Sequence, residues 1–208
     1  QGTYAIVNRQ TTPLSEIHLL WPRDLKIDHI AVDGATLAED FATHKRSFPF
    51  QIWRLATPMQ PGERREIHFS TTDEAVGFRT NSVLDDVNNN GTFINDRTIA
   101  PALGFSRDVL LRDRALRRKY GLPAELRMPR LEDDSARQFN YLRHDSDWVN
   151  ADITVSTEAG QTPIAPGYLV SGQTANGRRT AHFRTDAPIM NFFSIQSANY
   201  AVRHGGWH

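Results

Sequence analysis

The chain has 208 residues, of which 39% are hydrophobic and 23% are charged, as is typical of a folded globular domain. Its 24 basic residues balance its 24 acidic residues, and the arginines are scattered, so the composition argues against nucleic acid or an acidic membrane surface as a partner. Cysteine is absent, which excludes disulfides, thiol catalysis and cysteine-ligated zinc.

The first third of the chain predicts short strands joined by tight turns. Its apolar and polar residues alternate, which is typical of strands with one buried face. The dipeptide Asp33-Gly34 follows the segment Ile27–Val32 and favours a hairpin in which Leu37–Phe41 pairs back. Pro61-Gly62 suits the two central positions of a type II turn. Further strands are expected at Tyr4–Val7, Glu16–Trp21, Phe48–Leu55, Arg65–Phe69 and Val76–Val83.

The stretch Asn88–Leu122 interrupts this pattern with a long loop and one helix. Ser106 is a good N-cap, Gly121 suits the left-handed position after a helix, and Pro123 blocks continuation, so we expect a helix over Arg107–Tyr120. Its expected apolar stripe consists of Val109, Leu116 and Tyr120. Such a break in a β domain marks either a functional site or a docking surface.

The last third returns to strands. Trp148–Ser156 alternates cleanly, and Asn176-Gly177 predicts a hairpin between Tyr168–Val170 and Thr180–Arg184. The whole chain therefore predicts an all-β fold with one helix, and no linker divides residues 1–208 into two domains. The sequence begins without an initiator methionine or a signal peptide, and both ends look cut from a longer chain. We expect one domain excised from a longer chain.

The motifs of common catalytic sites are missing. The sequence contains no H-E-x-x-H zinc motif, no G-x-S-x-G nucleophile motif and no phosphate-binding glycine loop. Side chains with oxygen donors are dense over Asp85–Asn90. This segment is either a solvent-exposed loop or a calcium site. Tryptophan side chains form either a sugar-stacking platform or packing contacts, and packing is favoured. These residues are Trp21, Trp53, Trp148 and Trp207.

Several blocks of sequence resemble one family. They are LATPMQPGERREIHF, NGTFIND followed by PALGF, the helix end RRKYGL, and the ordered series DWVNADITVST, QTPIAPGYLV and GRRTAHFRTDAPIMNFFSIQSANY. Together they resemble the N-terminal β domain of the aminopeptidase N family of zinc metallopeptidases. More narrowly, they resemble the version of this domain that is fused behind multi-span permease segments of bacterial ABC-transporter-like proteins.

This resemblance implies a curved, saddle-like β-sandwich that packs against a thermolysin-like catalytic domain beginning after roughly Tyr200. The zinc ion and its ligands belong to that domain, so the resemblance implies no catalytic residue, cofactor or metal within this chain. The implied partner is the catalytic domain of the same parent chain. Membrane association would come only through transmembrane segments of the parent.

In the family, the loop equivalent to Asn88–Phe105 often lends a Gln or Glu to the substrate amine. Neither residue occurs in this loop, so the loop is expected to make contacts and not to take part in the chemistry. The alternative is an independent β-sandwich module that binds a glycan or peptide. The expected docking surface consists of Asn90, Phe93, Leu103, Phe105, Phe192, Phe193, Tyr200 and Trp207.

Overall fold

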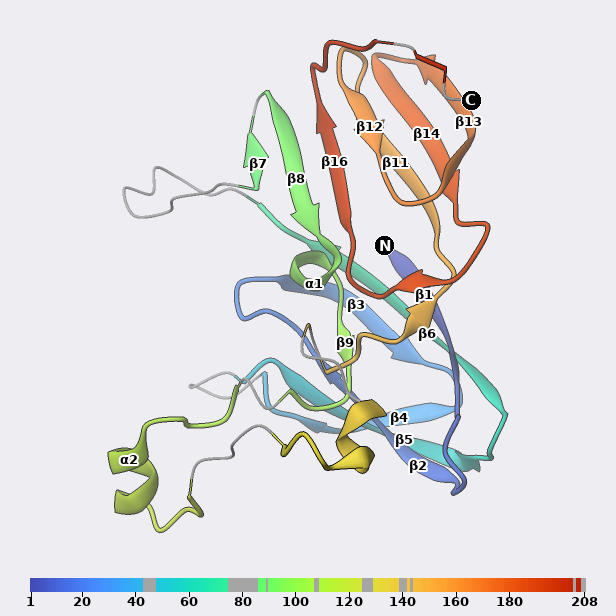
Figure 1. The fold of residues 1–208 in the computed structure, drawn as a ribbon. Coiled ribbons are helices and arrows are strands. Elements are labelled where there is room, and N and C mark those ends of the chain that lie inside the picture. Colours follow the sequence, from blue (N-terminus) through green and yellow to red (C-terminus); the bar gives the residue numbers. More distant parts are fainter. Residues whose placement is uncertain are drawn as a thin grey trace.

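The computed structural model describes residues 1–42, 48–74, 86–88, 90–106, 109–124, 129–138, 142, 144–203 and 205–206. Within them, the strands form five antiparallel sheets, four of which build two sandwiches stacked end to end (Figure 1). The expected all-β sandwich fold is confirmed. No described helix is long and apolar enough to cross a membrane.

The first sandwich holds the larger core. One of its sheets contains, in spatial order, β1 (Gly2–Val7), β6 (Arg64–Thr72) and β3 (Lys26–Val32), and the other contains β4 (Ala35–Asp40), β5 (Phe50–Met59), β2 (Leu14–Leu20) and β9 (Ala102–Leu103). The alternation expected in the sequence places the apolar residues of both sheets face to face. Its buried residues are Ile17, Leu19, Trp21, Leu25, Val32, Trp53, Leu55, Met59 and Ile67.

Two tight turns carry the chain between these sheets. The predicted hairpin at Asp33-Gly34 is wrong, because β3 pairs with β6 whereas β4 pairs with β5. The turn itself forms, with Gly34 at φ 65°, but it makes a corner of the sandwich. Pro61-Gly62 is confirmed as a turn, with Gly62 at φ 80° and a hydrogen bond from the Glu63 amide to the Gln60 carbonyl.

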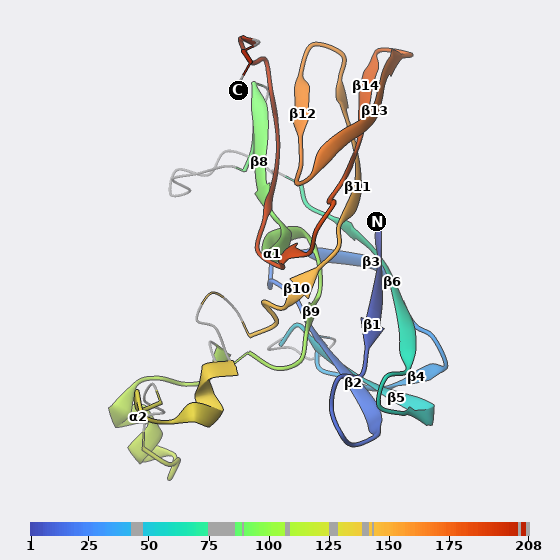
Figure 2. The ribbon, with the colours of Figure 1, turned by 45° about the vertical axis from the view of Figure 1, so that its right-hand side comes forward.

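The second sandwich has a smaller core. Its sheets contain β12 (Thr162–Ile164), β16 (Ser194–Ala198), β8 (Gly91–Asn95) and β7 (Val87–Asn88) in one layer, and β11 (Asp152–Glu158), β14 (Arg178–Arg184) and β13 (Tyr168–Ala175) in the other (Figure 2). Its buried apolar residues are Ala165, Ala181 and Phe183. The predicted hairpin at Asn176-Gly177 is confirmed, since it joins β13 to β14 with φ 52° and 73°.

A junction between the sandwiches is built around α1 (Asp96–Ile99) and the strand pair β10 (Trp148–Val149) and β15 (Ile189–Met190). Asp96 is buried, its backbone amide donates to the Phe193 carbonyl at 3.0 Å, and its Oδ1 accepts from the Phe193 amide at 3.1 Å. The Thr71 hydroxyl of the first sandwich donates to the Ile99 carbonyl at 2.7 Å. Both sandwiches are thus hydrogen-bonded to α1.

The predicted long helix is present only at its C-terminal end. The helix α2 spans Arg114–Lys119 and is capped by Asp113, whose Oδ1 accepts from the Leu116 amide at 2.7 Å. Ser106 is not its cap. Residues 107 and 108 lie outside the described residues, as do all of Val76–Val83. A 3₁₀ helix follows at Asp134–Gln138.

Candidate functional site

The structure leaves most of the predicted docking residues exposed. Four large side chains and one asparagine are exposed, and two side chains are half-buried. The exposed residues are Asn90, Phe93, Phe105, Phe192 and Tyr200, and the half-buried ones are Leu103 and Phe193. Trp207 lies outside the described residues. Their role in docking stays a prediction.

Phe93 and Tyr200 both lie beside Gln196 on the outer face of the sheet β12-β16-β8-β7. Phe93 lies directly opposite Gln196 of β16, and Gln196 lies directly opposite Ile164 of β12. Residues directly opposite on neighbouring strands point to the same face, so these three side chains form one row. The Tyr200 hydroxyl donates to Gln196 Oε1 at 3.4 Å. We call Ile164, Gln196, Phe93 and Tyr200 the sheet row.

Apolar side chains dominate the sheet row. Phe93 is 56% exposed, and Ile164 and Tyr200 are also exposed. Sequence analysis identified Phe93 and Tyr200 but missed Ile164. The three-residue strand β12 is too short to show an alternating pattern, so the sequence carries no signal for the face on which Ile164 lies.

Leu103 and Phe105 belong to a different surface. Leu103 is on β9, which pairs with β2 of the first sandwich, and its side chain packs against the larger core. The Phe105 ring lies 5.7 Å from the Phe50 ring in an edge-to-face arrangement and 6.1 Å from the Phe48 ring. The expected docking loop is therefore divided between the two sandwiches.

Phe192 and Phe193 lie at the junction. Phe193 exchanges two hydrogen bonds with Asp96, through its carbonyl and its amide, and its ring is only half-exposed. This arrangement gives Phe193 a structural task that the sequence did not reveal. Phe192 lies two residues after the end of β15 and is exposed.

The outer face of the sheet β11-β14-β13 carries polar groups and one exposed tyrosine. His182 Nε2 lies 2.7 Å from Asp152 Oδ1, and Arg184 donates to Asp152 Oδ2 at 2.8 Å. The Arg184 and His182 hydrogen bonds lower the pKa of the Asp152 carboxyl from its usual value. Tyr168, opposite Arg184, is 68% exposed. A shallow depression of about 380 Å³ lies beside them, lined by Thr154, Ser171, Gly172, Gln173, Thr180 and His182.

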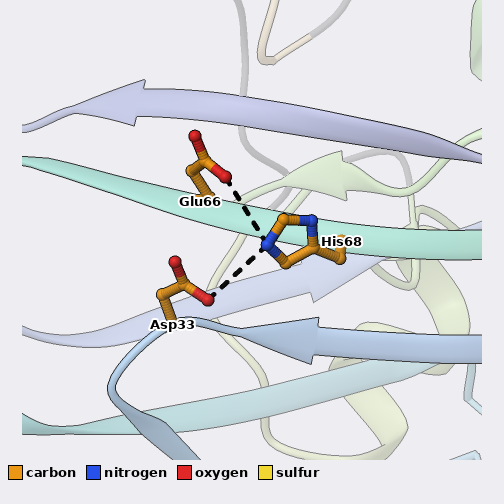
Figure 3. A group of neighbouring side chains, drawn as sticks. All are labelled: Asp33, Glu66 and His68. Carbon is orange, nitrogen blue, oxygen red and sulfur yellow. Dashed lines mark ion pairs between the residues drawn. The ribbon is translucent and has the colours of Figure 1, made fainter.

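One cluster of possible metal ligands is found among the described residues. It consists of Asp33, Glu66 and His68 on the outer face of the first sandwich (Figure 3). It bears no relation to the calcium alternative at Asp85–Asn90, where Asp85 and Asn89 lie outside the described residues.

The tryptophans do not gather into a platform in the described part of the chain. Trp21 and Trp53 are buried in the larger core, which confirms packing as their role, whereas Trp148 is exposed on β10. Trp21 and Trp53 therefore cannot take part in a sugar-stacking surface.

Comparisons with known proteins identify a shared fold. No protein-family model and no curated protein matches the sequence. Among solved structures, the M1 zinc metallopeptidase from Deinococcus radiodurans matches with a TM-score of 0.52 at 15% identity, covering 94% of this chain and 36% of that chain.

A mutant of a two-domain M1 zinc metallopeptidase bound to L-arginine matches with the same TM-score and identity, over 94% of this chain and 37% of its own. A mutant of the M1 zinc metallopeptidase from Deinococcus radiodurans, bound to a Tyr-Ser-Ala substrate, matches with a TM-score of 0.51 at 14% identity. The chain thus spans about a third of the length of these metallopeptidases and shares the fold of that part.

Proposed function

We propose that this chain is the non-catalytic N-terminal structural domain of an aminopeptidase-like protein of the zinc metallopeptidase type. In this proposal it packs against a catalytic domain outside this chain. The observation that carries the proposal is the fold likeness, which covers 94% of this chain but only 36% of the metallopeptidase chain. The resemblance of several sequence blocks to the N-terminal domain of the aminopeptidase N family supports the same assignment.

The residues present do not fit a peptidase zinc centre. Such a centre uses two histidines four positions apart on one helix with a glutamate between them, and the sequence contains no H-E-x-x-H. The three donors of the cluster at Asp33, Glu66 and His68 come from a strand and a turn. We therefore assign no catalytic step to this chain.

The sheet row supports a docking role. It lies on the outer face of an antiparallel sheet, a position that polar side chains normally fill when water covers it. Burying a phenylalanine such as Phe93 at an interface contributes about 1.5–3 kcal/mol. A catalytic domain that covers the row would also remove Ile164 and Tyr200 from water.

Membrane attachment in this proposal comes only from segments of the parent protein outside this chain, and its support is the sequence resemblance alone. The same holds for the fusion to ABC-transporter-like permease segments. Sequencing the parent gene on both sides of this chain tests both points at once.

The test of the docking role uses this chain and the segment that follows it in the parent, expressed separately. Isothermal titration should show association, and Phe93→Ser should weaken it by about tenfold or more, the loss expected for 1.5–3 kcal/mol. Leu169→Ser is the matched control, because Leu169 is equally exposed on the opposite sheet. Association that tolerates Phe93→Ser and Ile164→Ser together would exclude docking at the row.

A second assay tests the absence of catalysis. The chain alone, supplied with zinc, should not hydrolyse aminoacyl-p-nitroanilides, whereas the chain joined to the following segment should do so if the parent is an active peptidase. Hydrolysis by the chain alone would overturn the proposal.

The alternative function, a binding module for a glycan or peptide, is favoured by one observation. The polar depression on the sheet β11-β14-β13 is lined by hydroxyl, amide and imidazole groups, with the Tyr168 ring exposed on the same face. Glycan-array binding that Tyr168→Ala abolishes would establish this function, and an array without signal would exclude its glycan form.

A further inference from the structure

The cluster at Asp33, Glu66 and His68 joins a strand to a sandwich corner. Glu66 and His68 are two positions apart on β6, so both side chains project from the same outer face. Asp33 comes from the turn between β3 and β4, and its amide donates to the Glu66 carbonyl at 3.0 Å. Figure 3 shows the two carboxylates converging on one ring nitrogen of His68.

The distances in the cluster are too long for hydrogen bonds and close to those of shared metal ligands. His68 Nε2 lies 3.6 Å from Asp33 Oδ1 and 3.6 Å from Glu66 Oε2. A hydrogen bond from a ring nitrogen to an oxygen is about 2.7–3.2 Å long. Two ligands of one tetrahedral zinc ion, each about 2.1 Å from the metal, lie about 3.4 Å apart.

Among the described residues, the ion pairs of Asp33 and Glu66 are those with His68. Arg65 lies on the other face of β6 and pairs with Glu63, and no lysine or arginine of the described ranges forms an ion pair with Asp33 or Glu66. Two carboxylates held close to one another repel unless a cation lies between them. A metal ion bound by His68 Nε2 and both carboxylates would supply such a cation.

A fourth residue fixes the His68 ring. Thr3 of β1 lies directly opposite His68, and its Oγ1 is 3.1 Å from His68 Nδ1. Metal-binding histidines use such a contact at the second ring nitrogen, because a proton held there leaves the other nitrogen free to coordinate. In the tautomer with the proton on Nδ1, the ring donates to Thr3 Oγ1, and Thr3 is a positioning residue for Nε2.

We propose that Asp33, Glu66 and His68 bind a divalent transition-metal ion, with zinc as the probe, on the outer face of the first sandwich. One imidazole with two carboxylates is a donor set for zinc and similar ions, whereas calcium and magnesium prefer oxygen donors alone. Water completes the coordination. The ion would tie the corner at Asp33 to β6, which is a structural role independent of the docking proposal.

The experiment uses the full chain with His204 and His208 changed to alanine, because these histidines are four apart in the sequence and outside the described residues. Titration with zinc chloride by calorimetry should give one site, and zinc should raise the melting temperature, because it binds the folded state. His68→Ala and Asp33→Asn should each abolish binding. Thr3→Val should keep the site but weaken it by about tenfold or more.

His182→Ala is the matched control, because His182 also lies beside an aspartate, Asp152, but no second carboxylate pairs with it among the described residues. It should leave zinc affinity unchanged. NMR of the histidine ring nitrogens should show a zinc-dependent shift of the His68 Nε2 signal. The shift should occur both in the chain that keeps His182 and in the His182→Ala variant.

Three results would overturn the proposal. They are a titration without saturable binding, binding that survives His68→Ala, and a His68 ring that shifts with pH but not with zinc. The last result would identify the imidazolium as the cation between the two carboxylates.

Discussion

Gly167 gives the sharpest test of the packing in the second sandwich. It precedes β13 with φ 92°, a backbone conformation that residues with a side chain rarely adopt. A Cβ atom added there would lie 2.3 Å from the carbonyl carbon and oxygen of Arg184 and 2.6 Å from the Thr185 nitrogen. These are backbone atoms of the neighbouring strand, so no side-chain rotation relieves the overlap.

The expected loss of stability in Gly167→Ala has two parts. Backbone strain at such a φ contributes about 1–3 kcal/mol. Forcing β13 away from the chain after β14 is a form of overpacking and contributes about 1–3 kcal/mol more. The sum, about 2–6 kcal/mol, is a large share of the roughly 5–15 kcal/mol by which a native domain is stable.

Gly62→Ala separates the two parts. Gly62 has φ 80°, but no atom lies within 4 Å of an added Cβ. It should therefore lose only the conformational part, about 1–3 kcal/mol. Urea unfolding followed by circular dichroism measures both variants. Equal losses in Gly62→Ala and Gly167→Ala would refute the close approach of Gly167 to Arg184.

Three further predictions concern single contacts. Met59 is fully buried in the larger core, so Met59→Ala should lower the unfolding free energy by about 2–5 kcal/mol in urea titrations. The Tyr4 hydroxyl donates to the Pro101 carbonyl at 3.0 Å, so Tyr4→Phe should cost about 0.5–1.5 kcal/mol in the same assay, and no loss would argue against this bond. The lowered pKa of Asp152 gives a stabilisation that is complete above its unfolded-state pKa, about 3.9, and disappears as pH falls through the lower folded-state pKa. Asp152→Asn should thus be less stable than the unsubstituted chain at neutral pH and equally stable at strongly acid pH. A difference in unfolding free energy that does not change with pH would contradict this.

The sequence predicted the local features of the fold better than the long-range ones. Asn176-Gly177 and Pro61-Gly62 form the expected turns, because turn geometry depends on the two residues themselves. Asp33-Gly34 also turns, yet the strands that flank it enter different sheets. Turn chemistry does not determine which strand becomes the partner, since that depends on apolar faces distant in the sequence.

The helix was predicted too long for a similar reason. Capping and charge patterns extend back to Ser106, but Val109, Leu116 and Tyr120 are exposed, so the expected apolar stripe has no core to cover. Without such packing a helix gains little stability, and among the described residues of the predicted span the α-helix covers only the stretch capped by Asp113.

The candidate sites were predictable only in part. Phe93 and Tyr200 were identified as exposed aromatic residues, but the face that they share depends on the pairing of β8 with β16. The cluster around His68 could not be inferred from the sequence. Only Glu66 and His68 are close in the sequence, and Asp33 comes near them because the chain turns there from one sheet to the other.

The path of the chain through α1 has a consequence for modularity. The chain enters the second sandwich with β7 and β8, returns through α1 to add β9 to the first, and only later supplies the second with β11 to β14 and β16. A cut before β7 would strip β9 from the first sandwich, and a cut after β9 would strip β7 and β8 from the second. No single break in the chain frees two intact halves, so gene rearrangement can transfer them only together.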